Sequence, residues 1–215
     1  MFYYDDSLDL DSLDQSLVGC SCIGSCINCH KSNPYILCND SCACGEDCSK
    51  KSIAKLFPHS DRVSPRSNDK GVGLYSDEIL LKDSFICVYE GLYLNHINYH
   101  AHENSRSMNY LLKFIEKDED DKIIMTTVID GYPDFFEEKP YSACINHSCE
   151  PNLYIKPYRM DSQYPYILFF AKETIPNDTE LTFSYSDNDR YIPSSIPCLC
   201  KTKTCKKILP RTIQD

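Results

Sequence analysis

The sequence of 215 residues has little that would suit an exported or membrane-spanning protein. It begins MFYYDDSLDLDSLDQSLVG, which has neither a basic start nor an apolar run before a small-residue cleavage site. No apolar stretch approaches the ~20 residues that a membrane helix requires, and the best run spans only residues 166–171. We therefore expect no membrane partner and no secreted disulfide scaffold. Internal repeats and long low-complexity linkers are also absent.

Positive charge is scarce as well. The sequence has 22 Lys and Arg against 32 Asp and Glu, which gives a formal net charge of −10. Proteins that bind nucleic-acid backbones carry basic surfaces that neutralise phosphates. The charge balance therefore predicts no direct sequence-specific nucleic-acid binding and favours a basic partner.

Cysteine, in contrast, is abundant, with 14 residues of this type. Without an export signal the thiols are expected to stay reduced, and clustered reduced cysteines indicate metal binding. Eight of them fall within one short segment: Cys20, Cys22, Cys26, Cys29, Cys38, Cys42, Cys44 and Cys48. So short a segment cannot build its own apolar core, so metal–thiolate bonds must supply its folding energy, and zinc is the usual ion for closed tetrahedral sulfur sites.

A second cluster, near the C-terminal end of the sequence, contains three cysteines: Cys198, Cys200 and Cys205. A closed zinc site needs a fourth ligand. We predict that Cys149 supplies it and thereby fastens the end of the chain to its middle. Cys87 and Cys144 are expected to lie in the core.

The region between the clusters is rich in short runs of β-branched and aromatic residues, bounded by Asp, Gly, Asn or Pro. Strands are predicted over residues 84–94, 122–129 and 164–171. The acidic stretch 116–121 is expected to form a hairpin tip or a loop, and the strongest helical signal covers residues 95–107. The fold class is therefore mostly β.

Four motifs in this order resemble one known family. They are Gly71-Val72-Gly73, Tyr89-Glu90-Gly91, Asn146-His147-Ser148-Cys149-Glu150-Pro151-Asn152-Leu153 and Glu180-Leu181-Thr182-Phe183-Ser184-Tyr185. The sequence resembles the SET-domain protein lysine methyltransferases from about residue 20 to residue 209. The two cysteine clusters resemble the pre-SET and post-SET modules of the heterochromatin branch, which methylates lysine 9 of histone H3.

The resemblance implies a SET fold of short sheets with a threaded-loop pseudoknot. It divides the chain into an acidic tail at 1–19, a pre-SET zinc module at 20–63, a SET domain at 64–190 and a post-SET module at 191–215. The family's pre-SET module commonly holds three zinc ions with nine cysteines, whereas this chain has eight. One hypothesis makes His30 the ninth ligand, since imidazole binds zinc; the alternative leaves His30 solvated beside a two-zinc cluster.

The implied reaction transfers a methyl group from S-adenosyl-L-methionine to a lysine ε-nitrogen. By resemblance, Tyr185 is the catalytic tyrosine and Tyr110 a second tyrosine that orients the amine. Phe183 occupies the position that limits the number of methyl groups, and phenylalanine there predicts di- or trimethylation, because it cannot hold a water as tyrosine can. Without the resemblance, Tyr185 and Phe183 would pass for ordinary core aromatics.

Cofactor contacts are expected from Gly71, Val72 and Gly73, since glycine permits close approach of the backbone to a ligand. Asn146 and His147 match the cofactor-holding positions of the threaded loop; the competing interpretation of His147 is a core histidine. Asp130 resembles an acidic position that meets a basic substrate residue. The alternative is a turn aspartate before Gly131, since Asp-Gly is also a hairpin signal.

The resemblance implies the histone H3 tail as the basic partner and the nucleus, at chromatin, as the location. The sequence departs from the family at Val72, where a tryptophan is usual, and at Ala143-Cys144 before the Asn-His motif. These departures leave open a methyltransferase for another histone or non-histone lysine. A different class of alternative is an inactive scaffold that binds chromatin partners.

Overall fold

The computed structural model describes residues 3–4, 36–38, 42–45, 48–94, 110–132, 137–160, 162–186 and 193–210. Several of the features predicted above lie outside these residues. They are most of the acidic tail, the helical signal at 95–107, and the ligand candidates Cys20, Cys22, Cys26, Cys29 and His30.

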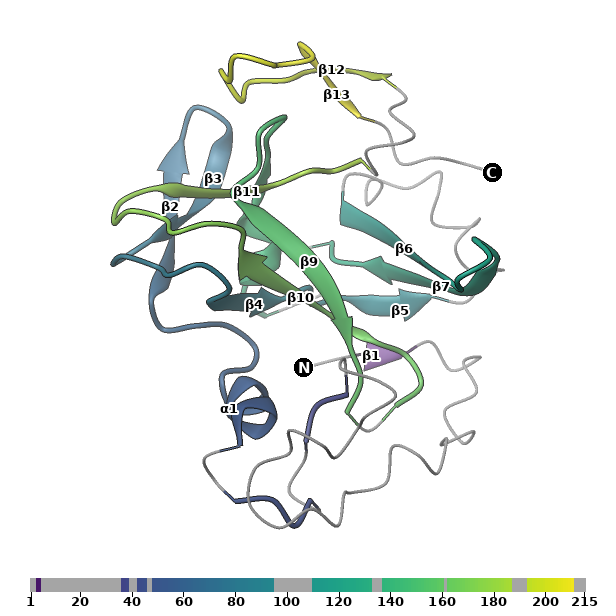
Figure 1. Ribbon diagram of the computed structural model, residues 1–215. Helices are drawn as coiled ribbons and strands as arrows, with labels where there is room; N and C mark the ends of the chain where they lie inside the picture. Colours follow the sequence, from purple (N-terminus) through teal and green to yellow (C-terminus); the bar gives the residue numbers. More distant parts are fainter. Residues whose placement is uncertain are drawn as a thin grey trace.

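Short β-strands make up most of the described chain, which confirms the predicted fold class (Figure 1). The described helices are α1 (Ser49–Lys55) and the 3-10 helix η5 (Tyr141–Cys144). The strands are β1 (Tyr3–Tyr4), β2 (Val63–Asn68), β3 (Gly71–Ser76), β4 (Phe85–Val88), β5 (Leu92–Leu94), β6 (Leu111–Lys117), β7 (Ile123–Asp130), β8 (Asn146–His147), β9 (Leu153–Tyr158), β10 (Tyr166–Ala171), β11 (Glu180–Phe183), β12 (Pro193–Pro197) and β13 (Ile208–Pro210).

These strands form four small sheets, in the orders β1-β5-β7-β6, β4-β10-β9, β2-β3-β11-β8 and β12-β13. In Figure 1 the β12–β13 hairpin lies at one end of the molecule and α1 at the other, with the three larger sheets between them. Most neighbouring strands run antiparallel, but β8 pairs with β11 in parallel and aligns Asn146 with Thr182 and His147 with Phe183. This pairing brings two distant sequence motifs together.

The predicted strand over residues 84–94 is in fact two strands, β4 and β5, in different sheets. The chain changes sheets at Gly91. A Cβ atom at this position would lie 2.4 Å from Ile129 Cγ2 and 2.6 Å from the Asp130 carbonyl oxygen. Glycine therefore permits the chain to cross close against β7, which a pattern of β-formers alone does not reveal.

The hairpin predicted at the acidic stretch is present, but its turn begins two residues later than expected. Glu116 and Lys117 still pair in β6, opposite Met125 and Ile123 of β7. The Asp118 carboxylate accepts the backbone N–H groups of Asp120 and Lys122 and so closes the turn.

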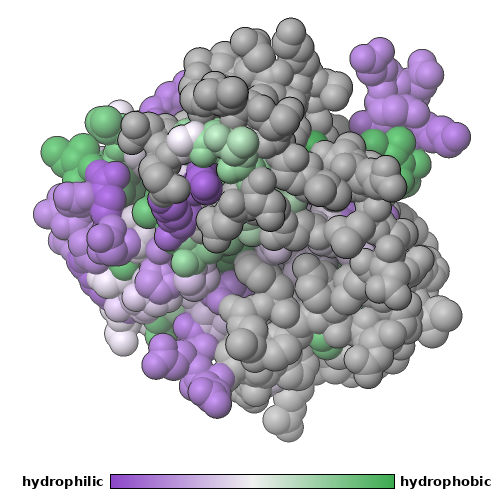
Figure 2. All heavy atoms as spheres, turned by 90° about the horizontal axis from the view of Figure 1, so that it is seen from below, coloured by the Kyte–Doolittle hydropathy of each residue, from purple (hydrophilic) through white to green (hydrophobic). Residues whose placement is uncertain are grey.

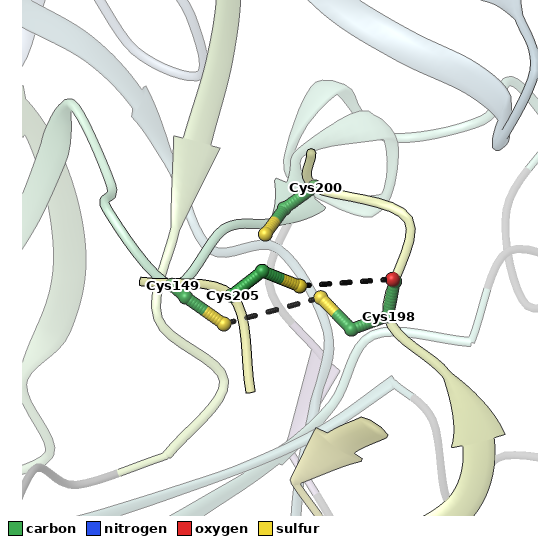
Figure 3. Close-up of side chains that lie close together, drawn as sticks. All are labelled: Cys149, Cys198, Cys200 and Cys205. Carbon is green, nitrogen blue, oxygen red and sulfur yellow. Dashed lines mark hydrogen bonds between the residues drawn. The ribbon is translucent and has the colours of Figure 1, made fainter. Parts of the chain in front are cut away.

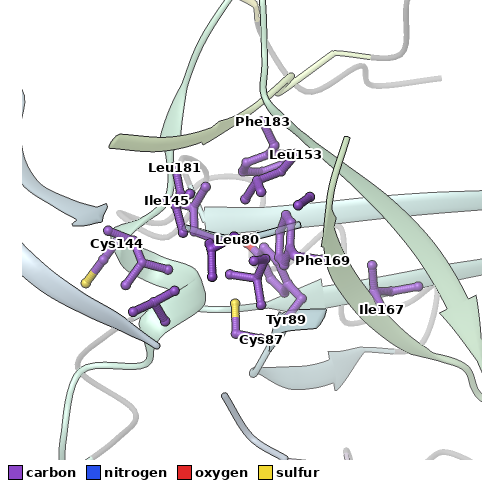
Figure 4. Packing of buried hydrophobic residues seen from close by; sticks show 14 of the residues in the cluster. Leu80, Cys87, Tyr89, Cys144, Ile145, Leu153, Ile167, Phe169, Leu181 and Phe183 are labelled. Carbon is purple, nitrogen blue, oxygen red and sulfur yellow. The ribbon is translucent and has the colours of Figure 1, made fainter. Parts of the chain in front are cut away.

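The main core lies where the three larger sheets meet (Figure 4). Strand β10 is the centre of its sheet and all six of its residues are buried, because both of its faces are covered. Its Phe169 contacts Phe183 of β11 edge to face, with ring centroids 5.0 Å apart. Cys87 and Cys144 are buried in this core, as predicted. The core thus holds the end of β11 in place.

The surface is mainly hydrophilic where Figure 2 shows described residues, with hydrophobic side chains in small separate groups. Exposed large apolar residues include Ile79, Leu81, Ile123 and Ile124. In the part of the chain that the structure describes, no helix has both the length and the apolar character to cross a membrane.

Candidate active site and thiol clusters

A cavity of about 1720 Å³ is lined by β6, the segment from η5 to β8, the end of β11 and the β12–β13 hairpin. It brings together six residues predicted from the sequence for catalysis or cofactor binding: Gly71, Val72, Tyr110, Asn146, Phe183 and Tyr185. Gly73, His147 and Asp130, which were predicted with them, do not line it.

The end of β11 carries the two aromatic residues that the resemblance singles out. Phe183 and Tyr185 have ring centroids 4.8 Å apart. The Tyr185 hydroxyl donates a hydrogen bond of 2.9 Å to the carbonyl oxygen of Ile145. Burial raises the pKa of the Tyr185 phenol, and the nearby Tyr110 and Glu180 add to the rise. The hydroxyl is therefore neutral at physiological pH.

Tyr89 also lines the cavity. It belongs to the Tyr-Glu-Gly motif, but no role was predicted for it. Its hydroxyl donates to the backbone carbonyl of Tyr110 at 2.5 Å, and that carbonyl also accepts the N–H of Gly131 at 3.0 Å. Burial first, then the neighbouring Tyr185, raises the pKa of the Tyr89 phenol. The contact fixes the main chain that carries the Tyr110 side chain. The sequence signal that could have singled out Tyr89 was its position in the Tyr-Glu-Gly motif.

His147 lies behind Tyr185 rather than in the cavity lining. Its Nδ1 accepts the backbone N–H of Tyr185 at 3.2 Å, and its Nε2 is 3.4 Å from Cys149 Sγ. Burial, together with the charges of Lys206 and Lys70, lowers the pKa of His147 to about 4. The imidazole is therefore neutral and contacts both the Tyr185 main chain and the Cys149 sulfur. The expectation that His147 holds the cofactor stays a prediction.

Glu180 gathers three polar side chains around one carboxylate, a role that the sequence did not reveal. Oε1 accepts from Asn146 Nδ2 at 2.9 Å and from Asn68 Nδ2 at 3.0 Å, while Oε2 pairs with the Lys70 ammonium. Asn146 Nδ2 also donates to the carbonyl oxygen of Val72 at 3.2 Å. Both amide hydrogens of Asn146 are thus committed, and its Oδ1 remains an acceptor.

Steric crowding explains why the second glycine position in the Gly-Val-Gly motif, Gly73, has no side chain. A Cβ atom on Gly73 would lie 2.5 Å from Asn68 Nδ2 and 2.9 Å from Glu180 Oε1. Any larger residue would displace this carboxylate network. Gly71 has a φ of 106°, a conformation that favours glycine.

Four thiols converge beside the cavity: Cys149, Cys198, Cys200 and Cys205 (Figure 3). Their sulfur atoms all lie within 4.8 Å of one another, and those of Cys149 and Cys198 are 3.9 Å apart. A tetrahedral zinc with Zn–S bonds of about 2.3 Å has S···S edges of about 3.8 Å. The donor set and its spacing therefore fit zinc, and Cys149 is the fourth thiol of the group.

Two further contacts fasten the C-terminal segment to the rest of the molecule. The Glu150 carboxylate accepts the backbone N–H and the hydroxyl of Thr204, at 3.0 and 2.7 Å. Lys201 forms an ion pair with Asp69 in the turn between β2 and β3. These contacts keep the β12–β13 hairpin over the cavity that residues 194–196 and 209–210 line.

A second thiol group lies near the N-terminal end of the described chain. The sulfur atoms of Cys38, Cys44 and Cys48 lie within 4.8 Å of one another, and Cys42 is buried in the same cluster. Cys38 and Cys48 have their sulfurs 3.9 Å apart, again close to a tetrahedral zinc edge. This geometry also fits zinc. The ligand role of His30 stays a prediction.

Asp130 differs from its expected setting, because it is fully buried at the end of β7. Its carboxylate accepts the backbone N–H of Tyr132 at 3.0 Å, which is the geometry of a turn aspartate. The expectation that it meets a substrate side chain stays a prediction.

Comparison with known proteins gives a family. A family model described as the SET domain matches residues 71–186, more than half of the chain. Histone-lysine N-methyltransferase SETMAR of Homo sapiens is 29% identical over 192 residues, which cover 82% of this chain and 27% of that protein. An H3 lysine-36 specific histone-lysine N-methyltransferase of Candida albicans is 27% identical, over 93% of this chain and 22% of its own length. The chain thus spans about a quarter of either relative.

SUV39H2 of Xenopus tropicalis, another histone-lysine N-methyltransferase, is 26% identical over 96% of this chain and 58% of that protein. Among solved structures, the methyltransferase domain of human SETMAR superposes with a TM-score of 0.73 at 22% identity, over 98% of this chain and 90% of that one. KRYPTONITE in complex with mCHH DNA, an H3(1-15) peptide and SAH superposes with a TM-score of 0.68 at 24% identity, over 97% and 46%. The relatives named here are histone-lysine N-methyltransferases. The fold is the SET fold, and the chain belongs to the SET-domain family.

Proposed function

We propose that this chain transfers methyl groups from S-adenosyl-L-methionine to a lysine of the histone H3 tail, with lysine 9 as the preferred site. One observation carries the proposal. Four aromatic residues, Tyr89, Tyr110, Phe183 and Tyr185, line the same cavity as Gly71, Val72 and Asn146. The aromatic group is suited to a lysine side chain, and the polar group to the amino-acid end of the cofactor.

Catalysis requires a neutral lysine amine. A free lysine has a pKa near 10.4, so at pH 7.4 only about one in a thousand is neutral, a deficit of roughly 4 kcal/mol. The aromatic side chains reduce water access, and desolvation favours the neutral amine. The Ile145 and Tyr110 carbonyls and the two tyrosine hydroxyls bound to them supply oxygens that can orient the N–H groups.

The cofactor, when bound, supplies an activated methyl group on a sulfonium. Its amino-acid end carries an ammonium and a carboxylate. Asn146 offers Oδ1 as an acceptor for the ammonium, since both of its N–H groups are committed. Lys70 lines the cavity beside Gly71, and its ammonium, which pairs with Glu180, has further N–H groups that can donate to the carboxylate. The polar lining thus suits both charges of the cofactor.

The substrate is proposed to bind as an added β-strand. Strand β6 is the edge of its sheet, and among the described strands it pairs with β7 only. Residues 111–115 and 117 of β6 line the cavity. The edge strand of a sheet is the place where an extended peptide can add as a further strand. The net charge of −10 further favours a basic tail.

Phe183 supports di- or trimethylation as the product. Its ring lines the cavity between Phe169 and Tyr185 and carries no hydroxyl. It therefore cannot anchor a water molecule that would compete with added methyl groups for space.

Lysine 36 of histone H3 is the alternative to lysine 9 as the target. The H3(1-15) peptide bound to KRYPTONITE favours this end of the H3 tail, while the H3 lysine-36 specific relative favours another lysine of the same histone. A histone substrate would place the protein at chromatin in the nucleus.

The test is an assay with labelled S-adenosyl-L-methionine across histone peptides, followed by mass spectrometry of the products. We expect label on H3 peptides that contain lysine 9 and none when that lysine is replaced by arginine. Label on a lysine-36 peptide instead would contradict the preference for lysine 9 but support methyltransferase activity. No label on any peptide or on whole histones, from a folded zinc-loaded chain, would leave the scaffold alternative.

A further inference from the structure

Arg159 joins the N-terminal cysteine segment to the end of β9 through its main chain. Its carbonyl oxygen accepts the Leu37 N–H at 2.6 Å, and Ile36 and Arg159 form a parallel β-bridge. Leu37 directly precedes Cys38 of the N-terminal thiol group. Strand β9 extends diagonally across the molecule toward this region in Figure 1. Arg159 is thus one point where the cysteine segment meets the SET domain; another is the packing of Leu37 against β4 and β10.

The side chain of Arg159 makes a second connection, to the β6–β7 hairpin. Its two terminal nitrogens pair with the two Glu116 carboxylate oxygens at 3.0 and 2.7 Å. One of them also contacts Met125 Sδ at 3.3 Å, and Nε donates to the Gln163 carbonyl at 2.8 Å. Only 17% of the Arg159 side chain and 14% of the Glu116 side chain are exposed. A bidentate pair this enclosed fixes geometry better than a surface ion pair.

Glu116 lies in the strand that lines the cavity but is not itself part of the lining. Its neighbours Ile115 and Lys117 both line the cavity. Residues from both faces of β6 line the cavity, but neither Glu116 nor Arg159 does. The ion pair therefore anchors the strand without occupying the space a peptide needs.

We propose that Arg159 is a positioning residue that couples the N-terminal cysteine segment to substrate binding on β6. The Arg159 side chain fixes the edge strand through Glu116. The Arg159 main chain binds Leu37, which directly precedes Cys38 of the N-terminal cluster of cysteines. The cysteine segment thereby contributes to peptide affinity without touching the peptide. This inference rests on the proposed function, since it assumes that the substrate adds to β6.

The experiment measures two affinities by calorimetry on the full zinc-loaded chain, for an H3 tail peptide and for S-adenosylhomocysteine. Glu116→Gln, Arg159→Gln and the double variant form a thermodynamic cycle. Glu78→Gln is the matched control, because Glu78 pairs with Arg62 on the surface and does not line the cavity. We expect Glu116→Gln to weaken peptide binding about tenfold, the size of coupling that packed networks transmit. Arg159→Gln should do the same, and the double variant no more than either.

Binding of S-adenosylhomocysteine should change less than about twofold in all variants, and kcat should change less than the peptide KM, because an altered strand position acts on substrate binding. Should Glu116→Gln fail to fold, Arg159→Lys, which keeps the cation and loses the fork, replaces it, with a smaller loss expected. Equal losses of both affinities, or none, overturn the inference. A wild-type chain that binds neither ligand overturns the proposed function itself.

Discussion

Tyr185 donates its backbone N–H to Nδ1 of His147 across 3.2 Å. Because Nδ1 accepts this bond and the imidazole is neutral, its proton resides on Nε2, which lies 3.4 Å from Cys149 Sγ. The same ring therefore holds the main chain of the proposed catalytic tyrosine and faces the sulfur of Cys149, one of the four clustered cysteines. In metal sites such contacts behind the ligands orient them and tune the metal. The four-thiol group thus supports the active site as well as the C-terminal hairpin.

Removing Cys149 should release one metal ion and weaken cofactor binding. Three thiols leave a tetrahedral site incomplete, and the Nε2 contact of His147 is lost. We expect Cys149→Ala to contain one zinc less per chain by native mass spectrometry and to bind S-adenosylhomocysteine about tenfold more weakly, the loss typical of disturbed metal support. Cys87→Ala removes a buried core thiol and should keep the zinc content. Equal zinc in both variants would contradict the assignment.

Tyr185→Phe isolates the contribution of one hydroxyl. The bond to Ile145 O is lost, and with it an oxygen that can orient the lysine amine. We expect kcat to fall on the order of 100-fold, as when one preorganised polar group is removed from an active site. The control is Tyr93→Phe, because the Tyr93 hydroxyl also donates to a backbone carbonyl, that of Pro165, outside the cavity. Similar kcat losses in the two variants would argue against a catalytic role for Tyr185.

The mostly β fold was predictable because β-branched and aromatic runs mark strands directly, as in Tyr166–Ala171. The approach of Cys149 to the C-terminal thiols was predictable from ligand counting, since three cysteines leave a zinc site one short. The break between β4 and β5 was not, because it depends on a contact between Gly91 and a strand nearly forty residues away in sequence. Local patterns carry no information about such crossings.

Glu180 and Tyr89 show the same limit within the site. Both lie in recognised motifs, yet their roles depend on partners from other strands: Asn68, Lys70 and Asn146 for Glu180, and the Tyr110 carbonyl for Tyr89. Asp130 is a further case, since its burial at the end of β7 could not be read from the residue type. Residue type suggests chemistry, whereas burial and partners depend on the fold.

Glu180→Gln should destabilise the chain. The amide keeps only one acceptor oxygen, so the donors of Asn68, Asn146 and Lys70 lose a shared partner. Leaving enclosed donors unsatisfied costs about 2 kcal/mol of unfolding free energy. Asp178→Asn is the control, since 78% of the Asp178 side chain is exposed and its pair with Arg66 contributes little. Urea unfolding of both variants checks this, and equal midpoints would count against the network.

The rate of methyl transfer should rise with pH without a descending limb below about pH 10. The neutral fraction of a lysine with a pKa near 10.4 grows about tenfold per pH unit below that value. Burial raises the pKa values of Tyr185 and Tyr89, so both phenols keep their protons as the solution becomes more alkaline. Initial rates at low peptide concentration from pH 7 to 9.5 test this, with circular dichroism to show that the chain stays folded. A fall in rate over that range, with the fold intact, would indicate that a tyrosine ionises.

Phe183→Tyr should shift the products toward monomethyl-lysine. The new hydroxyl would project from a ring fixed between Phe169 and Tyr185 into the cavity, where it can bind a water beside the amine. That water would occupy the space that a second or third methyl group requires. Mass spectrometry of a peptide at matched turnover should show less di- and trimethyl product and nearly unchanged first methylation.

Phe85→Tyr is the matched control for this substitution. Phe85 and Phe183 are each 7% exposed, so the added hydroxyl meets a similar degree of burial, but Phe85 does not line the cavity. The control should lose stability without changing the ratio of methylated products. If Phe183→Tyr leaves that ratio unchanged while its melting temperature falls as in Phe85→Tyr, then Phe183 is only a core residue, and the degree of methylation is set by other residues of the cavity.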